Sequence, residues 1–558
     1  MKAYLSIGVA LAALSSGIAF AADFPVKAPL PARVLSWTGF YAGINAGGSI
    51  GVNSDTQGAA VASSALGANG LLSTADKHAS PGAIVGGQIG YNWQLPSRWV
   101  VGLEADWQWT SQKNSASACT PAAGLFFFGA GANGFGYCLT DENKLTNFGT
   151  ARARGGVLIH DTLWYATGGA AWGTVRDNFA FAGTANPIVF PIALQPGPFL
   201  PGGGSFSKTK VGWTLGVGAE TQLGSRWSAK LEYLYVDLGS VNETFGIPIN
   251  PPFGPAFTAN GSAAAARSAH ITDNIVRVGL NYHFTPFGTT EAAAAGFPVT
   301  APLDAPNLNW TGLYAGINAG GGIGVNSDTQ SAAVASSALG ANGLLSTADK
   351  HASRGAVAGG QIGYNWQLRS RWVVGVEADW QWTSQKSSAS ACTPAAGLAF
   401  FGAGGNGFGY CLTDESKLTN FGTARARGGV LVHETLWYAT GGAAWGTVKD
   451  SFAFVGTANP IIFPAAFQPG PFLPNGESFS KTKVGWTVGV GAETQLSSRW
   501  SAKLEYLYVD LGSVNETFGI PINPLFGAAF TANGSAAAAR TTHITDNIVR
   551  VGLNYKIF

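Results

Sequence analysis

The sequence predicts an all-β protein, an antiparallel transmembrane β-barrel, and three observations carry this prediction. Charged residues make up 11% of the 558 residues, which is less than half of the roughly 25% usual in soluble domains. After residue 22, no uninterrupted apolar run reaches the about 18 residues expected of a transmembrane helix. Several segments alternate apolar and polar side chains, as a strand with one face in lipid does. Because only helices and closed barrels satisfy every backbone hydrogen bond inside a bilayer, the barrel is the remaining solution.

Residues 1–22 have the features of a secretory signal peptide. Lys2 supplies the positive start, Leu5 to Ile18 form the apolar core, and Ala19-Phe20-Ala21 matches the small-residue cleavage pattern. We expect the mature protein to begin near Ala22 or Asp23 and to open with a short periplasmic lead segment, residues 23–36.

The sequence contains a tandem repeat of one long unit. WTGFYAGINAGG at Trp37 returns as WTGLYAGINAGG at Trp310, an offset of 310 − 37 = 273 residues. The same offset holds without a gap from Trp37 to Tyr282. This repeat predicts a duplicated domain, with a first barrel at 37–284, a Pro- and Ala-rich linker at 285–309 and a second barrel at 310–558.

Each copy is predicted to contain eight strands. In residues 99–110, Trp99, Val101 and Leu103 alternate with polar or small residues such as Gly102 and Glu104, which marks one lipid-facing and one interior face. The expected strands of the first copy are 37–50, 82–95, 99–110, 145–160, 162–176, 208–223, 227–238 and 274–284.

The predicted connections alternate between tight turns and long loops. The tight turns are 96–98, the region of Asp161 and 224–226, and the long loops are 51–81, 111–144, 177–207 and 239–269. Outer-membrane barrels place short turns in the periplasm and long loops outside, so both ends of each copy should be periplasmic. Tryptophans near strand ends are expected at the lipid headgroups: Trp37, Trp93, Trp99, Trp109, Trp213 and Trp227.

Charged side chains on the interior face are the candidate site. Glu104 and Asp106 lie about as far above their tight turn as Arg154 and Arg152 lie above the next, so we expect them to meet at mid-depth. We interpret the set as an ion-pair network that neutralises buried charge, with a charged constriction for solutes as the alternative. The predicted members are Glu104, Asp106, Arg152, Arg154, Lys230, Glu232 and Arg277, and Glu377, Asp379, Arg425, Arg427, Lys503, Glu505 and Arg550.

The cysteines predict one disulfide in each half, between Cys119 and Cys138 and between Cys392 and Cys411, because export leads to an oxidising compartment. Their spacing does not suit zinc.

No catalytic, cofactor or metal site is predicted, and the protein is not expected to be an enzyme. His160-Asp161 and His433-Glu434 fit polar periplasmic turns, and His78 and His270 fall in or beside outer loops without an evident fixed partner. The net charge of +2 gives no electrostatic case for nucleic acid.

Several segments together resemble the opacity-type, OmpA-like small outer-membrane barrels, especially the surface proteins of alphaproteobacteria. They are WTGFYAG, GGQIGYNWQ, RWVVGLEADWQW, WSAKLEYLYVDLG and the closing RVGLNYHF. The resemblance implies one eight-stranded barrel per copy in the cell outer membrane, with a structural, surface-antigen or weakly porin-like role. It also implies contact with outer-membrane lipid and lipopolysaccharide, and insertion by the barrel-assembly machinery. Members of the family commonly have one barrel, so the duplication is a departure.

The duplication allows two separate barrels or one sixteen-stranded barrel. Interior glycines such as Gly86, Gly90 and Gly102 indicate a crowded, narrow interior, and the linker of 25 residues is long for a hairpin turn. We therefore expect two barrels with a structural and surface-exposed role, and we keep a porin for small hydrophilic solutes as the alternative. The last residue, Phe558, lies one position out of phase with the end of the first copy.

Overall fold

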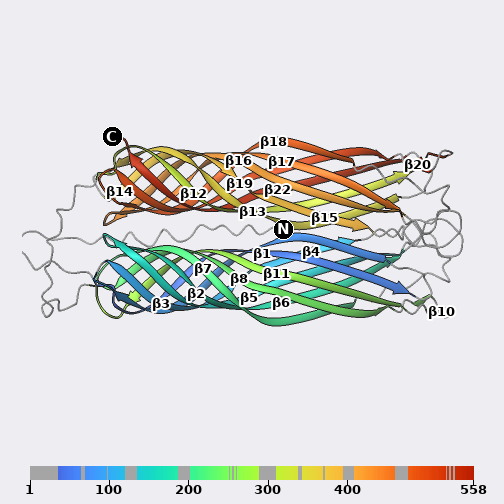
Figure 1. Cartoon of the computed structure of the whole chain (residues 1–558), viewed down its shortest axis with the longest axis horizontal. Coiled ribbons are helices and arrows are strands. Elements are labelled where there is room, and N and C mark those ends of the chain that lie inside the picture. The colour runs from blue at the N-terminus through green and yellow to red at the C-terminus, as the bar shows by residue number, and fades with distance from the viewer. Residues whose placement is uncertain are drawn as a thin grey trace, which may run out of the picture.

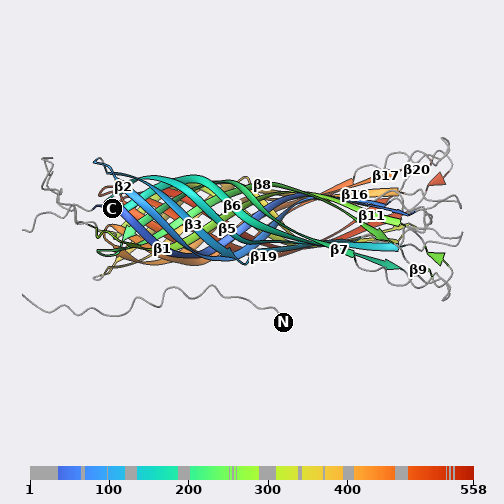
Figure 2. The same ribbon diagram turned by 90° about the horizontal axis from the view of Figure 1, so that it is seen from below.

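The computed structural model describes residues 36–63, 70–96, 98–119, 135–185, 202–249, 252–253, 257–258, 261–287, 309–336, 342–368, 371–393, 408–458, 475–522, 525–526, 530–531 and 534–558. In these residues the chain folds as two antiparallel β-barrels that lie side by side with their long axes parallel (Figure 1, Figure 2). None of the described residues forms a helix long and apolar enough to cross a membrane.

The first barrel closes with eight strands in the order β1-β2-β3-β5-β6-β7-β8-β11, and β11 pairs back onto β1. The short β4 continues the direction of β3 and pairs with the outer part of β5. The strands are β1 (Gly39–Ser63), β2 (Gly70–Gln94), β3 (Trp99–Thr110), β4 (Lys113–Cys119), β5 (Phe135–Ile159), β6 (Thr162–Ala185), β7 (Gly202–Gln222), β8 (Trp227–Ile249) and β11 (Gly261–His283), with β9 (Pro252–Phe253) and β10 (Phe257–Thr258) forming a small separate hairpin.

The second barrel repeats this order and closes through β12 and β22. The prediction of two eight-stranded barrels is therefore confirmed. The strands are β12 (Gly312–Ser336), β13 (Asn342–Gln367), β14 (Trp372–Thr383), β15 (Lys386–Thr393), β16 (Phe408–Val432), β17 (Thr435–Ala458), β18 (Asn475–Gln495), β19 (Trp500–Ile522) and β22 (Gly534–Lys556), with the hairpin of β20 (Leu525–Phe526) and β21 (Phe530–Thr531).

Most strands are longer than the sequence predicts. β1 continues to Ser63 and β2 begins at Gly70, although the apolar alternation stops near Ile50 and resumes near Gly82. The expectation of long loops at 51–81, 111–144, 177–207 and 239–269 is thus wrong for much of their length. Residues 111–112 lie between two strands, and the other non-strand residues of these ranges lie outside the described ones. Beyond the bilayer neither face of a strand meets lipid, so the alternation is lost while the backbone ladder continues.

The two faces of the strands inside the bilayer follow the sequence prediction. Along β3, exposed and buried residues alternate from Trp99 to Trp109, and the exposed ones are apolar. The prediction for Trp37 is wrong: its side chain is 1% exposed and packs on His283 and Phe287 at the periplasmic mouth. Trp37 precedes β1, which begins only at Gly39, so the chain can turn its indole inward instead of toward lipid.

Candidate functional site

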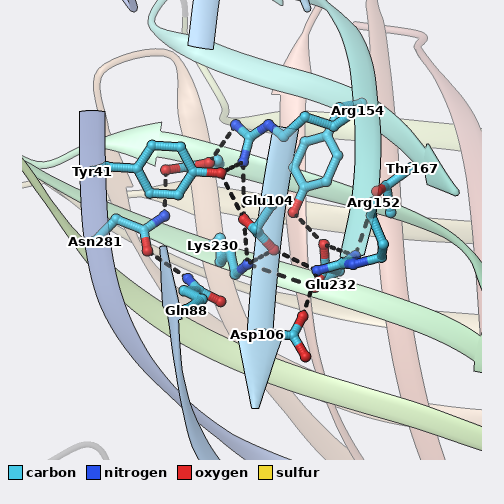
Figure 3. A network of polar contacts seen from close by, with 12 residues as sticks. Tyr41, Gln88, Glu104, Asp106, Arg152, Arg154, Thr167, Lys230, Glu232 and Asn281 are labelled. Atoms are coloured by element: carbon cyan, nitrogen blue, oxygen red, sulfur yellow. Dashed lines mark hydrogen bonds and ion pairs between the residues drawn. The ribbon is translucent and has the colours of Figure 1, made fainter. Parts of the chain in front are cut away.

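An ion-pair network fills the first barrel at mid-depth (Figure 3). Arg152 of β5 lies at its centre, with Nη1 3.0 Å from Oε1 of Glu232 and Nη2 2.9 Å from Oδ2 of Asp106. The same guanidinium also pairs with Glu104. One cation from β5 therefore joins three carboxylates, two from β3 and one from β8, across the barrel interior.

Two further cations complete this central group. Nη2 of Arg277 lies 2.6 Å from Oε2 of Glu232 and 2.9 Å from Oδ2 of Asp106. Nζ of Lys230 lies 3.0 Å from Oε1 of Glu104. These predicted interior residues of the first copy thus lie together, and they come from two pairs of neighbouring strands, β3 with β5 and β8 with β11.

Arg154, a predicted member of the network, binds further partners that were not predicted from the sequence. Its Nη2 lies 2.7 Å from Oε2 of Glu220, and its guanidinium lies over the ring of Tyr165 at 4.5 Å. The hydroxyl of Tyr41 donates a hydrogen bond of 2.8 Å to Oε2 of Glu104. Glu220 could have been found from the sequence, because the tight turn between β7 and β8 places it directly opposite Lys230. Glu104 and Arg152 are likewise directly opposite in the register of β3 with β5.

The network balances its own charge. Its carboxylates are Glu104, Asp106, Glu220 and Glu232, its cations are Arg152, Arg154, Lys230 and Arg277, and all of them are buried. Buried ions must be paired in this way because removing an ion from water costs several kcal/mol even after relaxation.

The second barrel repeats the network at the offset of 273 residues. Nη1 of Arg425 lies 3.0 Å from Oε1 of Glu505, and Nη2 of Arg427 lies 2.6 Å from Oε2 of Glu493. The buried members are Glu377, Asp379, Arg425, Arg427, Glu493, Lys503, Glu505 and Arg550. Glu493, like Glu220, is an addition to the predicted set.

Apolar side chains close the interior on both sides of the network. On the extracellular side, Phe148, Leu234 and Ile275 belong to a buried cluster, and each is 1% exposed or less. On the periplasmic side, Trp37, Leu163 and Phe287 belong to another. The first barrel is thus filled at three levels, and the second has equivalent clusters around Phe421 and Trp310.

The histidines occupy defined positions. The expectation that His270 lacks a fixed partner is wrong, because Nδ1 contacts Oγ of Ser240 at 3.1 Å and Nε2 contacts Oδ2 of Asp237 at 3.3 Å. The sequence pattern does not predict the contact of His270 with Asp237 and Ser240, because simple alternation places these two residues on opposite sides of β8. A bulge, with Gly239 at φ +72°, brings them to the same side. The contacts also reverse those of a serine hydrolase, in which serine contacts Nε2 and aspartate contacts Nδ1.

His78 also differs from its prediction, because it lies in β2 and is 5% exposed. His160 lies in the tight turn between β5 and β6 with φ +56°, and His433 lies in the equivalent turn of the second barrel. In the part of the chain that the structure describes, no group of three or more His, Cys, Asp or Glu side chains could hold a metal ion.

These features together define a transmembrane β-barrel protein, since each barrel is closed, apolar toward lipid and polar at its centre. Residues 9–284 and again residues 289–556 match the family model of the outer membrane protein beta-barrel domain. The chain belongs to this family, and it is a protein of the cell outer membrane.

Two relatives carry a single unit of this kind. The 31 kDa outer-membrane immunogenic proteins of Brucella melitensis biotype 1 and Brucella suis biovar 1 are each 35% identical over 261 residues. The match covers 46% of this chain and 88% of each relative. The family and these relatives are described as outer-membrane proteins.

Some solved structures also match the chain, at low sequence identity. Ail of Yersinia pestis is 12% identical, with 42% of this chain and 99% of Ail covered and a TM-score of 0.16. OprG of Pseudomonas aeruginosa is 10% identical, with 45% of this chain and 97% of OprG covered and a TM-score of 0.20.

Proposed function

We propose that the protein is a structural and surface-display component of the outer membrane, in which two closed barrels anchor extracellular segments. The observation that carries this proposal is the filling of each barrel at three levels: the apolar cluster around Phe148, the ion-pair network around Arg152 and the periplasmic cluster around Trp37. A solute path would have to displace all three. Small barrels of eight strands have interiors that side chains just fill.

Opening such a path is energetically unfavourable. Moving Arg152 aside would leave Glu104, Asp106 and Glu232 without a shared cation, and breaking one buried ion pair costs about 3–5 kcal/mol. The network therefore acts as a fixed filler in this proposal. The porin alternative needs a continuous water path, and the charged constriction it invokes is occupied by paired side chains.

Planar-bilayer conductance of the purified full chain tests the proposal. We expect no steady channels from the wild type. A matched variant without the filling should conduct. In this variant alanine replaces Arg152, Phe148 and Trp37 and their counterparts Arg425, Phe421 and Trp310. A heat-dependent gel shift must show that its barrels are folded. Large, steady, weakly selective channels from the wild type would instead establish the porin function.

The remaining parts of the proposal concern processing and partners. Residues 1–22 serve as the signal peptide, residues 23–36 as the lead segment and residues 285–309 as the linker between barrel units 37–284 and 310–558. The apolar outer faces contact outer-membrane lipid and lipopolysaccharide, and the barrel-assembly machinery inserts the chain. The immunogenic character named for the Brucella relatives supports exposure of the extracellular segments to the host or environment. No enzymatic role is part of the proposal, and unchanged lipid A and protein profiles in a deletion strain are expected.

A further inference from the structure

Some side chains on the outer face of the barrels are buried, although lipid-facing neighbours are exposed. Glu220 and Gln222 point into the first barrel, so Thr221 between them points outward, yet it is 0% exposed. Val52 and Ala79, on the outer faces of β1 and β2, are also 0% exposed. By contrast, the lipid-facing Val101 and Val211 are 40% and 72% exposed. One side of each barrel is therefore covered by protein and not by lipid.

Reciprocal hydrogen bonds join the two barrels at the periplasmic end of this covered side. Oγ1 of Thr162 lies 2.8 Å from Oγ1 of Thr435, its own counterpart at the offset of 273 residues. Nε1 of Trp164 donates to Oγ1 of Thr494 at 3.1 Å, and Nε1 of Trp437 donates to Oγ1 of Thr221 at the same distance. A contact between a residue and its own counterpart, flanked by a mirrored pair, is the mark of a two-fold interface.

The extracellular end of the covered side follows the same symmetry. His78 pairs in register with its counterpart His351, and Val52, Ala79, Val325 and Ala352 form one apolar cluster across the barrels.

Beyond this cluster the strands of the two barrels pair with each other. Residues 73–75 of β2 pair with 390–392 of β15, and residues 117–119 of β4 pair with 346–348 of β13. The two sheets thus join outside the bilayer, although each barrel closes separately within it.

The two copies differ at this interface in a way that makes it directional. Arg354 of the second copy takes the place of Pro81 in the first. Its Nη2 donates to the carbonyl oxygen of Val52 at 2.8 Å and to Oγ1 of Thr272 at 2.7 Å, both in the first barrel. Pro81 has no side-chain donor to make the reverse contact. At this position a cation therefore reaches from the second barrel to the first, and Pro81 cannot return the contact.

Small and hydroxyl-bearing side chains suit contact between protein surfaces inside a membrane. Lipid is as apolar as leucine, so association there depends on close packing and hydrogen bonds, which residues such as Thr162, Thr221 and Ala79 allow. The indole N–H groups of Trp164 and Trp437 donate across this contact, and in lipid they would lose these acceptors.

We propose that this covered side is a heterotypic docking surface, through which the second barrel binds the first and presents the extracellular segments of both copies as one joint surface. Its partner is the other half of the same chain, and Arg354 adds two hydrogen bonds to this contact. The linker makes this contact intramolecular, which raises the effective concentration of each half for the other.

Cross-linking of the full chain tests the pairing. In the starting variant the native cysteines are changed to serine and a protease site is inserted in the linker. Two double variants are then compared: the interface pair Thr162→Cys with Thr435→Cys, and the lipid-facing pair Val101→Cys with Val374→Cys. In nanodiscs holding one chain each, we expect the interface pair to oxidise at least about tenfold faster than the control pair, because only the former is held in proximity. A heat-dependent gel shift verifies that each variant is folded.

Cleavage of the linker then measures the docking itself. The two halves should stay associated after cleavage without any cross-link, and Arg354→Ala should weaken their association by about tenfold or more, since it removes two charge-assisted hydrogen bonds. Arg371→Ala, at an exposed arginine of a periplasmic turn, serves as the matched control. Halves that separate on cleavage, or equal oxidation of the two cysteine pairs, would each overturn the proposal.

Discussion

Arg152 and Glu232 meet inside the first barrel with Nη1 and Oε1 3.0 Å apart, although 80 residues separate them in the sequence. Glu232 also accepts from Arg277 and from the hydroxyl of Tyr165, at 2.7 and 3.0 Å. The pair is therefore one link of a connected network, and the loss of either member leaves several partners buried without compensation.

Replacing Arg152 with methionine should destabilise the first barrel by about 3–5 kcal/mol, because it leaves Glu104, Asp106 and Glu232 with too few cations. Urea-induced unfolding in detergent, followed by tryptophan fluorescence, measures the change. Arg98→Met, at an exposed turn residue, should have an effect of less than about 0.5 kcal/mol. Adding Glu104→Gln to Arg152→Met should recover part of the loss, and a double variant with simply additive costs would argue against a coupled network.

Gly90 and Gly155 offer a matched pair of glycines. A Cβ on Gly90 would collide with the hydroxyl of Tyr41, which bonds to Glu104, whereas a Cβ on Gly155 would have no heavy atom within 4 Å. Gly90→Ala should therefore cost about 1–3 kcal/mol of unfolding free energy through overpacking. Gly155→Ala should be neutral or slightly stabilising, because it only restricts the unfolded chain. Equal effects of the two changes would show that the interior is not crowded at Tyr41.

The sequence predicts a side chain's position correctly wherever that position depends on the two-residue alternation of a strand or on the distance from a tight turn. The outward Val101 and Leu103 follow from alternation, and the meeting of Glu104 with Arg152 follows from equal heights above two tight turns. It fails where the cause lies elsewhere. The extracellular parts of the strands lack alternation because no lipid faces them, and Trp37 turns inward because it precedes β1. The bulge at Gly239 shifts the alternation along β8 by one residue, so the sequence does not predict the contact of Asp237 with His270. The contact of Thr162 with Thr435 depends on how two barrels pack, which no local pattern records.

The cysteines are predicted to form one disulfide in each half. The register of β4 with β5 places Cys119 directly opposite Cys138, and the register of β15 with β16 places Cys392 opposite Cys411. Mass spectrometry of a protease digest without reductant should find these two cross-linked peptide pairs. Peptides joining Cys119 to Cys392, or alkylation of all four thiols in protein taken directly from the envelope, would contradict the pairing.

Glu415 should titrate below an ordinary glutamate. It lies on the extracellular part of β16, where Lys386 and Lys417 donate to its carboxylate at 2.6 and 2.5 Å and lower its pKa. A lowered folded-state pKa stabilises the fold above the unfolded-state pKa, and this contribution is lost as the pH falls through the folded value. Lys417→Ala should raise the pKa toward the usual range, which a carboxyl-carbon NMR titration of Glu415 can follow. An unchanged midpoint would mean that Lys417 is not its partner in solution.

The end of the chain makes a final prediction. Ile557 donates its backbone N–H to the oxygen of Leu313 at 2.8 Å, as Phe284 donates to Phe40 at 3.0 Å in the first barrel, so Ile557 holds the position that Phe284 holds. Phe558 is one residue further and 74% exposed. Phe558→Ala should therefore change the unfolding free energy of the refolded protein by less than about 0.5 kcal/mol. Ile557→Pro should be clearly destabilising, because proline cannot donate the closing hydrogen bond. Comparing the membrane-inserted yield in cells with the refolding yield in detergent separates a role of Phe558 in assembly from a role in stability. A loss for Phe558→Ala in cells alone would mean that the assembly machinery recognises the Phe558 ring although it is one position out of phase. A loss in detergent would contradict the exposed position of Phe558.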